Sequence, residues 1–124
     1  MLDTHALIWF LEGDNQLSPK ARAVIADPAN RIFVSIASFW EIAIKVSIGK
    51  LNLTIPLASI IERTIEEDIT ILPIDLPHVL KILDLEQHHR DPFDRIIIAL
   101  AICEGFDVVS RDEVFKDYPV NILW

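Results

Sequence analysis

The chain has 124 residues, of which 52% are hydrophobic, and its formal net charge is −8 at pH 7. At this length we expect one domain spanning residues 1–124, because two halves would each be too short to bury a core. The acidic balance argues against a general nucleic-acid-binding protein, which normally carries a basic face. It also raises the question of where the acidic residues gather.

The composition is unusually apolar for so short a chain, with a mean hydropathy of +0.36. We therefore expect a second copy or a partner protein to cover part of the apolar surface. The longest apolar run, residues 96–103, is far shorter than the roughly 20 residues of a membrane-spanning helix. The only cysteine is Cys103, and Asp3 stands where a secretory signal would carry Lys or Arg. These features predict a cytoplasmic protein that does not enter a membrane.

The first third of the chain is typical of a short strand followed by two helices. Residues 1–2 are apolar and form the end of a strand that runs into Asp3. Residues 4–11 are mostly apolar and predict a buried helix. A second helix is expected over residues 18–26, because it starts with Ser as N-cap and Pro at the first helical position.

The middle of the chain continues the alternation of strands and helices. Residues 31–35 predict a buried strand, and the long helix that follows is expected to stop at Gly49. Residues 56–68 predict a helix, residues 69–72 a strand and residues 77–85 a short helix.

The last third contains the most apolar helix of the chain. It is predicted over residues 92–104 and is closed by Gly105. A strand over residues 107–110, a helical turn over residues 112–116 and a last strand over residues 120–124 follow. Strands that alternate with helices and are apolar on both faces indicate an α/β fold, with a parallel sheet covered on both sides.

Four acidic residues fall where such a fold places its functional sites. In open parallel sheets, ligands bind beyond the carboxyl ends of the strands. Asp3 follows the first strand, Glu41 lies early in the helix after the second, and Asp94 lies in the first turn of the 92–104 helix. Asp112 comes just after the strand at 107–110. Helix dipoles and free backbone amides favour negative charge at these places.

Each of the four acids also has an explanation as a helix cap. Asp3 and Asp112 precede helical segments, and residues 38–41 (Ser-x-x-Glu) match a capping box. Asp91 is expected to be the N-cap of the next helix, which would place Asp94 at the third helical position. Capping and ligand binding are compatible roles for Asp3 and Asp112, so both explanations stay open.

Several stretches of the chain, in this order, resemble the PIN-domain ribonucleases, and specifically the VapC toxins of type II toxin–antitoxin systems. Together they span nearly the whole chain and are highly specific in combination. They are residues 2–9 (LDTHALIW), 34–45 (VSIASFWEIAIK), 49–51 (GKL), 89–95 (HRDPFDR) and 109–112 (VSRD).

The resemblance implies an acidic metal pocket made of Asp3, Glu41, Asp94 and Asp112, with Asp3 and Asp94 as direct ligands. It implies a three-layer α/β/α fold whose parallel five-stranded sheet has the order 3-2-1-4-5, with helices on both faces. It also implies a homodimer, RNA as the substrate and a small antitoxin protein as a partner. One departure is that only two apolar residues precede Asp3, where the family usually has several. We therefore expect either residues upstream of Met1 or a less stable central strand.

A pocket of carboxylates suits Mg²⁺ or Mn²⁺, because these cations prefer oxygen ligands. The predicted activity is metal-dependent hydrolysis of RNA phosphodiester bonds with one or two bound cations. An inactive PIN fold that acts as a binding module is the alternative. Two other phosphate chemistries fit poorly. A phosphotransfer receiver needs an acidic pair after the first strand, and a haloacid-dehalogenase-type phosphatase needs Asp where this chain has His5.

Other polar and aromatic residues are given more ordinary roles. Lys45 is expected to form an i,i+4 ion pair with Glu41. Arg95 is a candidate RNA contact, although a solvated surface charge is the simpler expectation. The histidines at 88–89 fit either the rim of a site or a polar loop, and the aromatic pair at 9–10 is expected in the core or at an interface.

Overall fold

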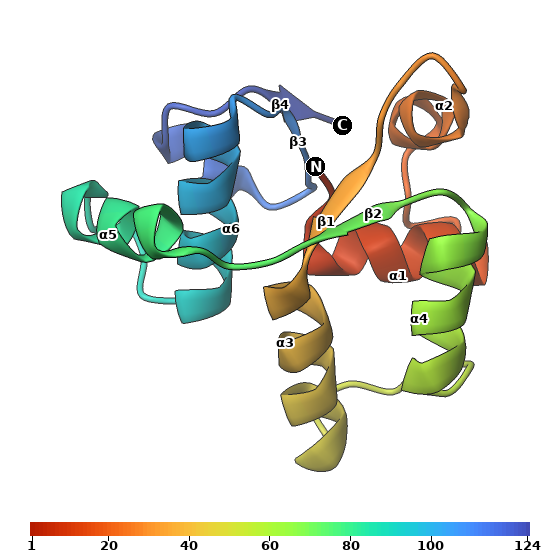
Figure 1. Ribbon diagram of the computed structural model, residues 1–124. Helices are drawn as coiled ribbons and strands as arrows, with labels where there is room; N and C mark the ends of the chain where they lie inside the picture. The colour runs from red at the N-terminus through yellow and green to blue at the C-terminus, as the bar shows by residue number, and fades with distance from the viewer.

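The computed structural model describes residues 1–124 (Figure 1). Every element predicted from the sequence is present, except that the first strand is reduced to the single bridging residue Leu2. No helix is both long enough and apolar enough to span a membrane. The elements are α1 Thr4–Glu12, α2 Pro19–Ala26, β1 Phe33–Ser35, α3 Ile36–Ser47, α4 Leu57–Glu66, β2 Thr70–Leu72, α5 Leu76–Asp84, α6 Pro92–Glu104, β3 Val108–Val109, the 3-10 helix η1 Glu113–Asp117 and β4 Ile122–Leu123.

The helix starts follow their capping residues, with one correction. Asp91 caps α6 as predicted, since its Oδ1 accepts hydrogen bonds from the backbone N–H groups of Phe93 and Asp94 at 2.8 and 3.2 Å. The predicted capping box at 38–41 is wrong. Ser35 lies at the end of β1 and already accepts from the Ala37 N–H at 3.1 Å, so α3 begins before Ser38. The Ser38 hydroxyl is buried inside that helix with no hydrogen-bond partner.

The strands form two parallel pairs, β1 with β2 and β3 with β4. Leu2 lies between the pairs and forms isolated parallel bridges to Val34 and Val109. The parallel pairing predicted from the sequence is confirmed. The order of a single five-stranded sheet is not confirmed, because α1 starts at Thr4 and leaves only the bridging residue Leu2 where a first strand was expected.

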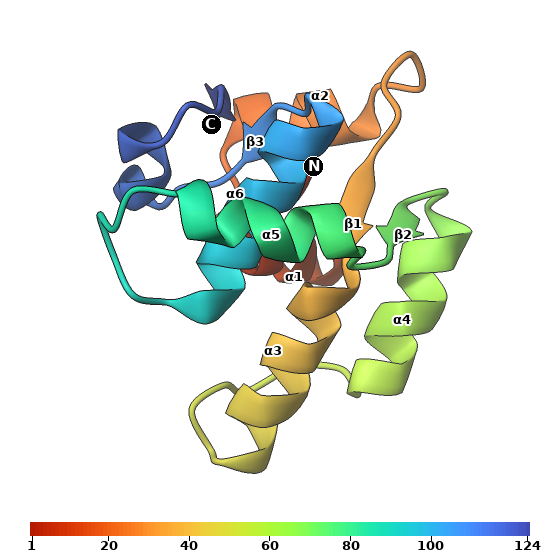
Figure 2. The same ribbon diagram turned by 60° about the vertical axis from the view of Figure 1, so that its left-hand side comes forward.

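Neighbouring strand residues point to opposite faces and fill two separate hydrophobic clusters. Leu2, Val34 and Val109 belong to one cluster, and the residue before each of them packs into the other. The first cluster is completed by side chains of α1, α2 and α4, and the second mainly by side chains of α6 and η1. Helices therefore cover both faces of the strands, with α4 on one side and α5 with α6 on the other (Figures 1 and 2).

The aromatic pair at 9–10 belongs to the core and not to an exposed face. Trp9 is buried and packs edge-to-face against Trp124, with ring centroids 5.9 Å apart, and Phe10 packs against the same cluster. The exposed apolar surface lies elsewhere. Helix α5 exposes Leu76, Val79, Leu80 and Leu83, the last of them by 81%.

Candidate functional site

The four predicted acids line one hollow of about 130 Å³ at the carboxyl ends of the strands. We call it the acidic hollow. The structure thus brings together residues that lie up to 109 positions apart in the sequence, from Asp3 to Asp112. The lining residues are Asp3, Thr4, His5, Glu41, Lys45, Asp91, Asp94, Asp112 and Phe115.

Asp3 is both the N-cap of α1 and a wall of the acidic hollow. Its Oδ1 accepts a hydrogen bond from the Ala6 N–H at 2.6 Å, and a second hydrogen bond links its side chain to Ser110. Burial raises the pKa of Asp3, and the charge of Glu41 adds to this, although the hydrogen bonds from Ser110 and Ala6 oppose it. Capping and exposure to the hollow therefore coexist in one side chain.

Glu41 is buried and has both carboxylate oxygens occupied. Thr4 Oγ1 donates to Oε2, and Lys45 Nζ lies against Oε1, so the predicted i,i+4 ion pair is confirmed. Partial burial lowers the pKa of Lys45, but the hydrogen bond and charge of Glu41 raise it more, with help from Asp91 and Asp94. Lys45 therefore keeps a positive charge beside the hollow at neutral pH.

Asp94 lies at the third position of α6 but does not cap the helix, because Asp91 already accepts from the N–H groups there. Burial raises the pKa of Asp94 from 3.8 to about 7, and the charges of Asp91, Glu41, Asp112 and Asp3 add to this. Burial is thus the main cause of the raised pKa, and repulsion among the acids adds to it.

Asp112 is the most exposed of the four acids and caps η1, with its Oδ1 3.0 Å from the Val114 N–H. Ser110 Oγ accepts from the Asp112 N–H at 3.0 Å, so this serine contacts two of the acids. Asp91, which sequence reasoning treated only as a cap, also lines the hollow. The i,i+3 spacing of Asp91 and Asp94 across the first turn of α6 was the signal for it.

The donor set of the hollow fits a hard divalent cation, since it consists of carboxylate oxygens whose repulsion a cation would relieve. In their present orientations, however, no three His, Cys, Asp or Glu side chains are grouped so that they could hold one ion. Asp3, Glu41 and Asp112 are turned toward capping or ion-pair partners. A bound cation would require some of these side chains to rotate.

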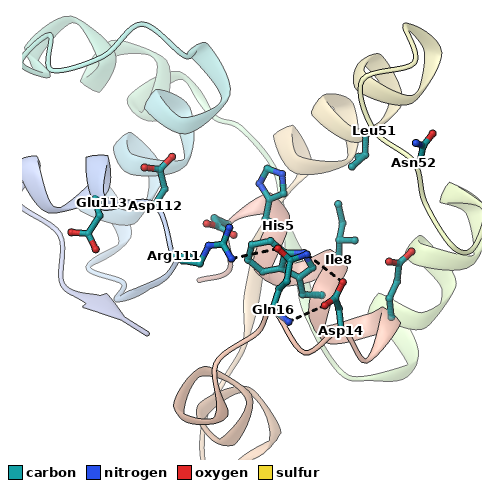
Figure 3. A pocket seen from close by; sticks show the side chains of 12 residues that line it. His5, Ile8, Asp14, Gln16, Leu51, Asn52, Arg111, Asp112 and Glu113 are labelled. Atoms are coloured by element: carbon teal, nitrogen blue, oxygen red, sulfur yellow. Dashed lines mark hydrogen bonds between the residues drawn. The ribbon is translucent and has the colours of Figure 1, made fainter.

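A larger hollow of about 690 Å³ adjoins the first and shares Asp3, His5 and Asp112 with it. We call it the open hollow. Arg111 and Asp112 lie on one side of it and Leu51 and Asn52 on the other (Figure 3). The Arg111 guanidinium stacks over the Trp9 ring, 4.9 Å from its centroid. His5, which the two hollows share, is exposed at their junction.

Two other sequence interpretations change at this site. Arg95 is not a solvated surface charge, because its guanidinium donates to the backbone carbonyls of Ile82, Leu85 and Glu86 at 2.8 to 3.2 Å. His89 is more than a polar loop residue, since it contacts Asp94 directly, with Nε2 3.3 Å from Oδ2. No pattern in the sequence pairs His89 with a particular acid.

The short parallel strands, the helices on both faces and the acids at the strand ends define the class of protein. A family model described as PIN domain matches residues 1–121. The chain belongs to the PIN domain family.

More particular matches point to the VapC group. The chain is 25% identical over 126 residues to Ribonuclease VapC22 of Mycobacterium tuberculosis (strain ATCC 25618 / H37Rv), a match covering 98% of this chain and 96% of that protein. Its fold resembles a chain in the crystal structure of VapBC2 from Rickettsia felis bound to a DNA fragment from their promoter. The TM-score is 0.70 at 17% identity, and the match covers 98% of this chain and 95% of that one. The resemblance to PIN-domain VapC-type toxins is confirmed.

The raised pKa of Asp94 predicts how the stability of the metal-free protein depends on pH. The unfolded chain loses the Asp94 proton near pH 3.8, whereas the folded protein keeps it until about pH 7. Between these values the folded state binds more protons, so the free energy of unfolding falls as pH rises and then levels off. Asp94→Asn should flatten this slope and stabilise the protein in EDTA at pH 8 by about 1–3 kcal/mol, less than the full pKa displacement because solvent screens the side chain.

Urea unfolding across this pH range measures the effect. The matched control is Asp84→Asn, which removes the same charge at an exposed position on α5. If the dependence of unfolding free energy on pH is unchanged in Asp94→Asn, or if the metal-free variant is less stable than the wild type, Asp94 acts only as a favourable charge at the start of α6.

Proposed function

We propose that the chain is a Mg²⁺- or Mn²⁺-dependent endoribonuclease that acts as the toxin of a toxin–antitoxin pair. The observation that carries the proposal is the gathering of Asp3, Glu41, Asp94 and Asp112 around one hollow. Membership of the PIN domain family and the similarity to a protein named Ribonuclease VapC22 support it. The same proposal takes Leu2, which bridges β1 on one side and β3 on the other, as the centre of a sheet of order 3-2-1-4-5.

In this proposal Asp3 and Asp94 hold the cation directly, and Glu41 and Asp112 complete the site directly or through water. A divalent cation in the hollow would neutralise charge on the phosphate and help to activate the attacking water. The reaction is a hydrolysis in which the water oxygen attacks phosphorus and one P–O ester bond breaks. The departing oxygen leaves with a proton as a hydroxyl group.

The chain's own residues hold the acids around the hollow. Ser110 and the Ala6 N–H hold Asp3, and Lys45 and Thr4 hold Glu41. A cation would turn some of these side chains toward itself. Asp94 carries a pKa near 7, so at neutral pH it is poised to exchange its proton for a cation. Because Lys45 stays charged, it offsets part of the repulsion that an RNA phosphate would meet among five acids.

The alternative function, an inactive PIN fold that only binds a partner, predicts that the acids have no shared task. The presence of all four acids around one hollow argues against it. Turnover of RNA that requires a divalent cation would decide between the two functions.

The first prediction of the proposal is cleavage of single-stranded or loop RNA in Mg²⁺ or Mn²⁺ but not in EDTA. Asp3→Asn and Asp94→Asn should each lower the rate by at least about 100-fold, because each removes a direct ligand. Far-UV circular dichroism should stay unchanged, and Asp84→Asn is again the control. Cleavage that survives both substitutions, or that persists in excess EDTA, would place the activity elsewhere.

We further propose that the partner is a small antitoxin whose basic segment lies in the open hollow. That hollow holds Glu12, Asp14 and Glu113 in addition to the acids it shares, and Arg111 is its only Lys or Arg. It continues through Leu51 and Asn52 into an open groove lined largely by apolar residues between 46 and 57. The charge and the apolar continuation fit a peptide with a basic part and an apolar part, and the similar fold in a VapBC2 complex supports this partner.

A synthetic peptide with an apolar amphipathic half followed by a run of arginines tests this surface. The double variant Glu12→Gln/Asp14→Asn should bind it about 3- to 10-fold more weakly in fluorescence anisotropy, since two unlike-charge contacts are lost. The affinity of the wild type for the peptide should also fall as the salt concentration rises. Glu66→Gln/Glu67→Gln at the C-terminal end of α4 removes the same charge at exposed positions and should bind like the wild type. Equal binding by both double variants would show that the peptide binds outside the open hollow.

We also propose a homodimer in which the exposed face of α5 packs against a second copy. This face carries the side chains Leu76, Val79, Leu80 and Leu83 at helical spacing. Trp40, on α3, is 62% exposed, and α3 and α5 both pack against α6. The apolar surfaces of α3 and α5 therefore flank one helix, and a two-fold axis would bring each patch onto itself.

Light scattering at micromolar concentrations tests the dimer. The wild type should be dimeric, and Leu80→Ser/Leu83→Ser should be monomeric, because polar side chains then face the partner. Ile65→Ser, at an equally exposed apolar position on α4, should leave the dimer intact. A monomeric wild type, or dissociation caused only by Ile65→Ser, would contradict the assignment of this face.

A further inference from the structure

Asp94 differs from the other three acids in how its side chain is held. Asp3 and Asp112 accept hydrogen bonds from backbone N–H groups, and Glu41 is held by Lys45 and Thr4. Asp94 accepts no backbone hydrogen bond through its side chain. Its only side-chain hydrogen-bond partner is His89, whose Nε2 lies 3.3 Å from Oδ2.

His89 is itself fixed from its other side. Its Nδ1 lies 2.8 Å from the hydroxyl oxygen of Tyr118, a buried residue that follows η1 and packs into the second hydrophobic cluster. The side chain of His89 is only 16% exposed. The imidazole therefore bridges a rigid, buried phenol and the one acid that lacks another support.

The chemistry of Asp94 determines the direction of these hydrogen bonds. An ionised carboxylate only accepts, so the hydrogen of a neutral His89 imidazole lies on Nε2 and is donated to Asp94. Nδ1 then accepts from the Tyr118 hydroxyl. The same hydroxyl oxygen accepts from Arg95 Nη1 at 3.3 Å, and three backbone carbonyls at the end of α5 hold the guanidinium in place.

We propose that His89, oriented by Tyr118, is a positioning residue that sets the direction of the Asp94 carboxylate in the acidic hollow. This inference rests on the proposed metal-dependent function of that hollow. With Oδ2 held by His89, Oδ1 is the oxygen of Asp94 left for a cation. A carboxylate whose second oxygen is fixed binds with less loss of side-chain freedom than one that must first be ordered.

His88, the preceding residue, provides a matched contrast. Its ring also packs edge-to-face on Tyr118, with centroids 4.9 Å apart, but its Nε2 pairs with the exposed Glu86 at 3.1 Å. It makes no hydrogen bond to any acid of the hollow. A purely structural role in anchoring the loop would therefore be shared by His88 and His89, whereas the orientation of Asp94 belongs to His89 alone.

Calorimetric titration of the full chain with MnCl₂, without RNA, tests the proposal. His89→Asn should weaken Mn²⁺ binding by about tenfold, because the Asn amide reaches only the position of Nδ1 and leaves Asp94 unsupported. His89→Gln places an N–H near the position of Nε2 and should stay within about threefold of the wild type. His88→Asn should bind Mn²⁺ like the wild type. In RNA cleavage, His89→Asn should raise the half-saturating Mn²⁺ concentration by the same factor, with the rate largely restored at saturating Mn²⁺.

Equal Mn²⁺ affinity for His89→Asn and the wild type, or an equal loss in His88→Asn, would overturn the positioning role while leaving the nuclease proposal in place. A wild type that neither binds Mn²⁺ nor cleaves RNA would overturn both.

A second measurement needs no substitution and therefore holds even if His89→Asn fails to fold. Nitrogen-15 NMR of the metal-free wild type at pH 8 should show the His89 imidazole with hydrogen on Nε2 and an unprotonated Nδ1. The opposite tautomer would reverse the hydrogen bonds described above and exclude the proposed orientation.

Discussion

The backbone of residues 1–3 is the constraint on which the rest of the molecule depends. Leu2 N donates to Phe33 O and Val109 N donates to Met1 O, both at 2.8 Å, and Asp3 N donates to Val109 O at 3.1 Å. These bonds join the two strand pairs, and the alternation of side chains along the same residues feeds both hydrophobic clusters. Because α1 begins directly after Asp3, the position of Asp3 is fixed between the two strand pairs, at the carboxyl ends of their strands.

The acidic hollow arises because the same carboxylates that cap helices also line the site. Asp3, Asp91 and Asp112 each satisfy backbone N–H groups at a helix start, which stabilises the element that carries them. Since three such starts meet at one edge of the strands, the caps themselves build a concentration of negative charge. Asp94 adds a carboxylate with no capping task, and it is the acid whose pKa is raised to about 7. Burial is the main cause of that raised pKa, and the negative charges of the three capping acids add to it.

The sequence predicted the α/β class, the element order and the gathering of the four acids at the strand ends, because capping residues, apolar runs and strand ends are local patterns. The predictions from the sequence failed where two residues could take the same role, or where interacting residues lie far apart in the sequence. Ser35 and Ser38 are both plausible caps, and only the end of β1 shows that Ser35 comes first. Arg95 was expected to be a surface charge, but its guanidinium donates hydrogen bonds to backbone carbonyls at the end of α5. The contact between His89 and Tyr118 joins residues 29 positions apart, and no periodicity encodes such a pair.

The electrostatics of the hollow also connect the proposed activity with the proposed control of it. The negative charge of the acidic hollow would attract a divalent cation or a basic peptide and would repel an RNA phosphate. In the proposed function, the acidic hollow without a cation would repel RNA and attract the basic peptide, which would favour the inhibited state. A bound cation would weaken both effects, and it would also replace the proton that Asp94 retains up to about pH 7. In this proposal a cation and the antitoxin segment would compete for the same negatively charged site. The affinity for metal, and with it the orientation of Asp94, would then influence how readily the antitoxin inhibits the nuclease.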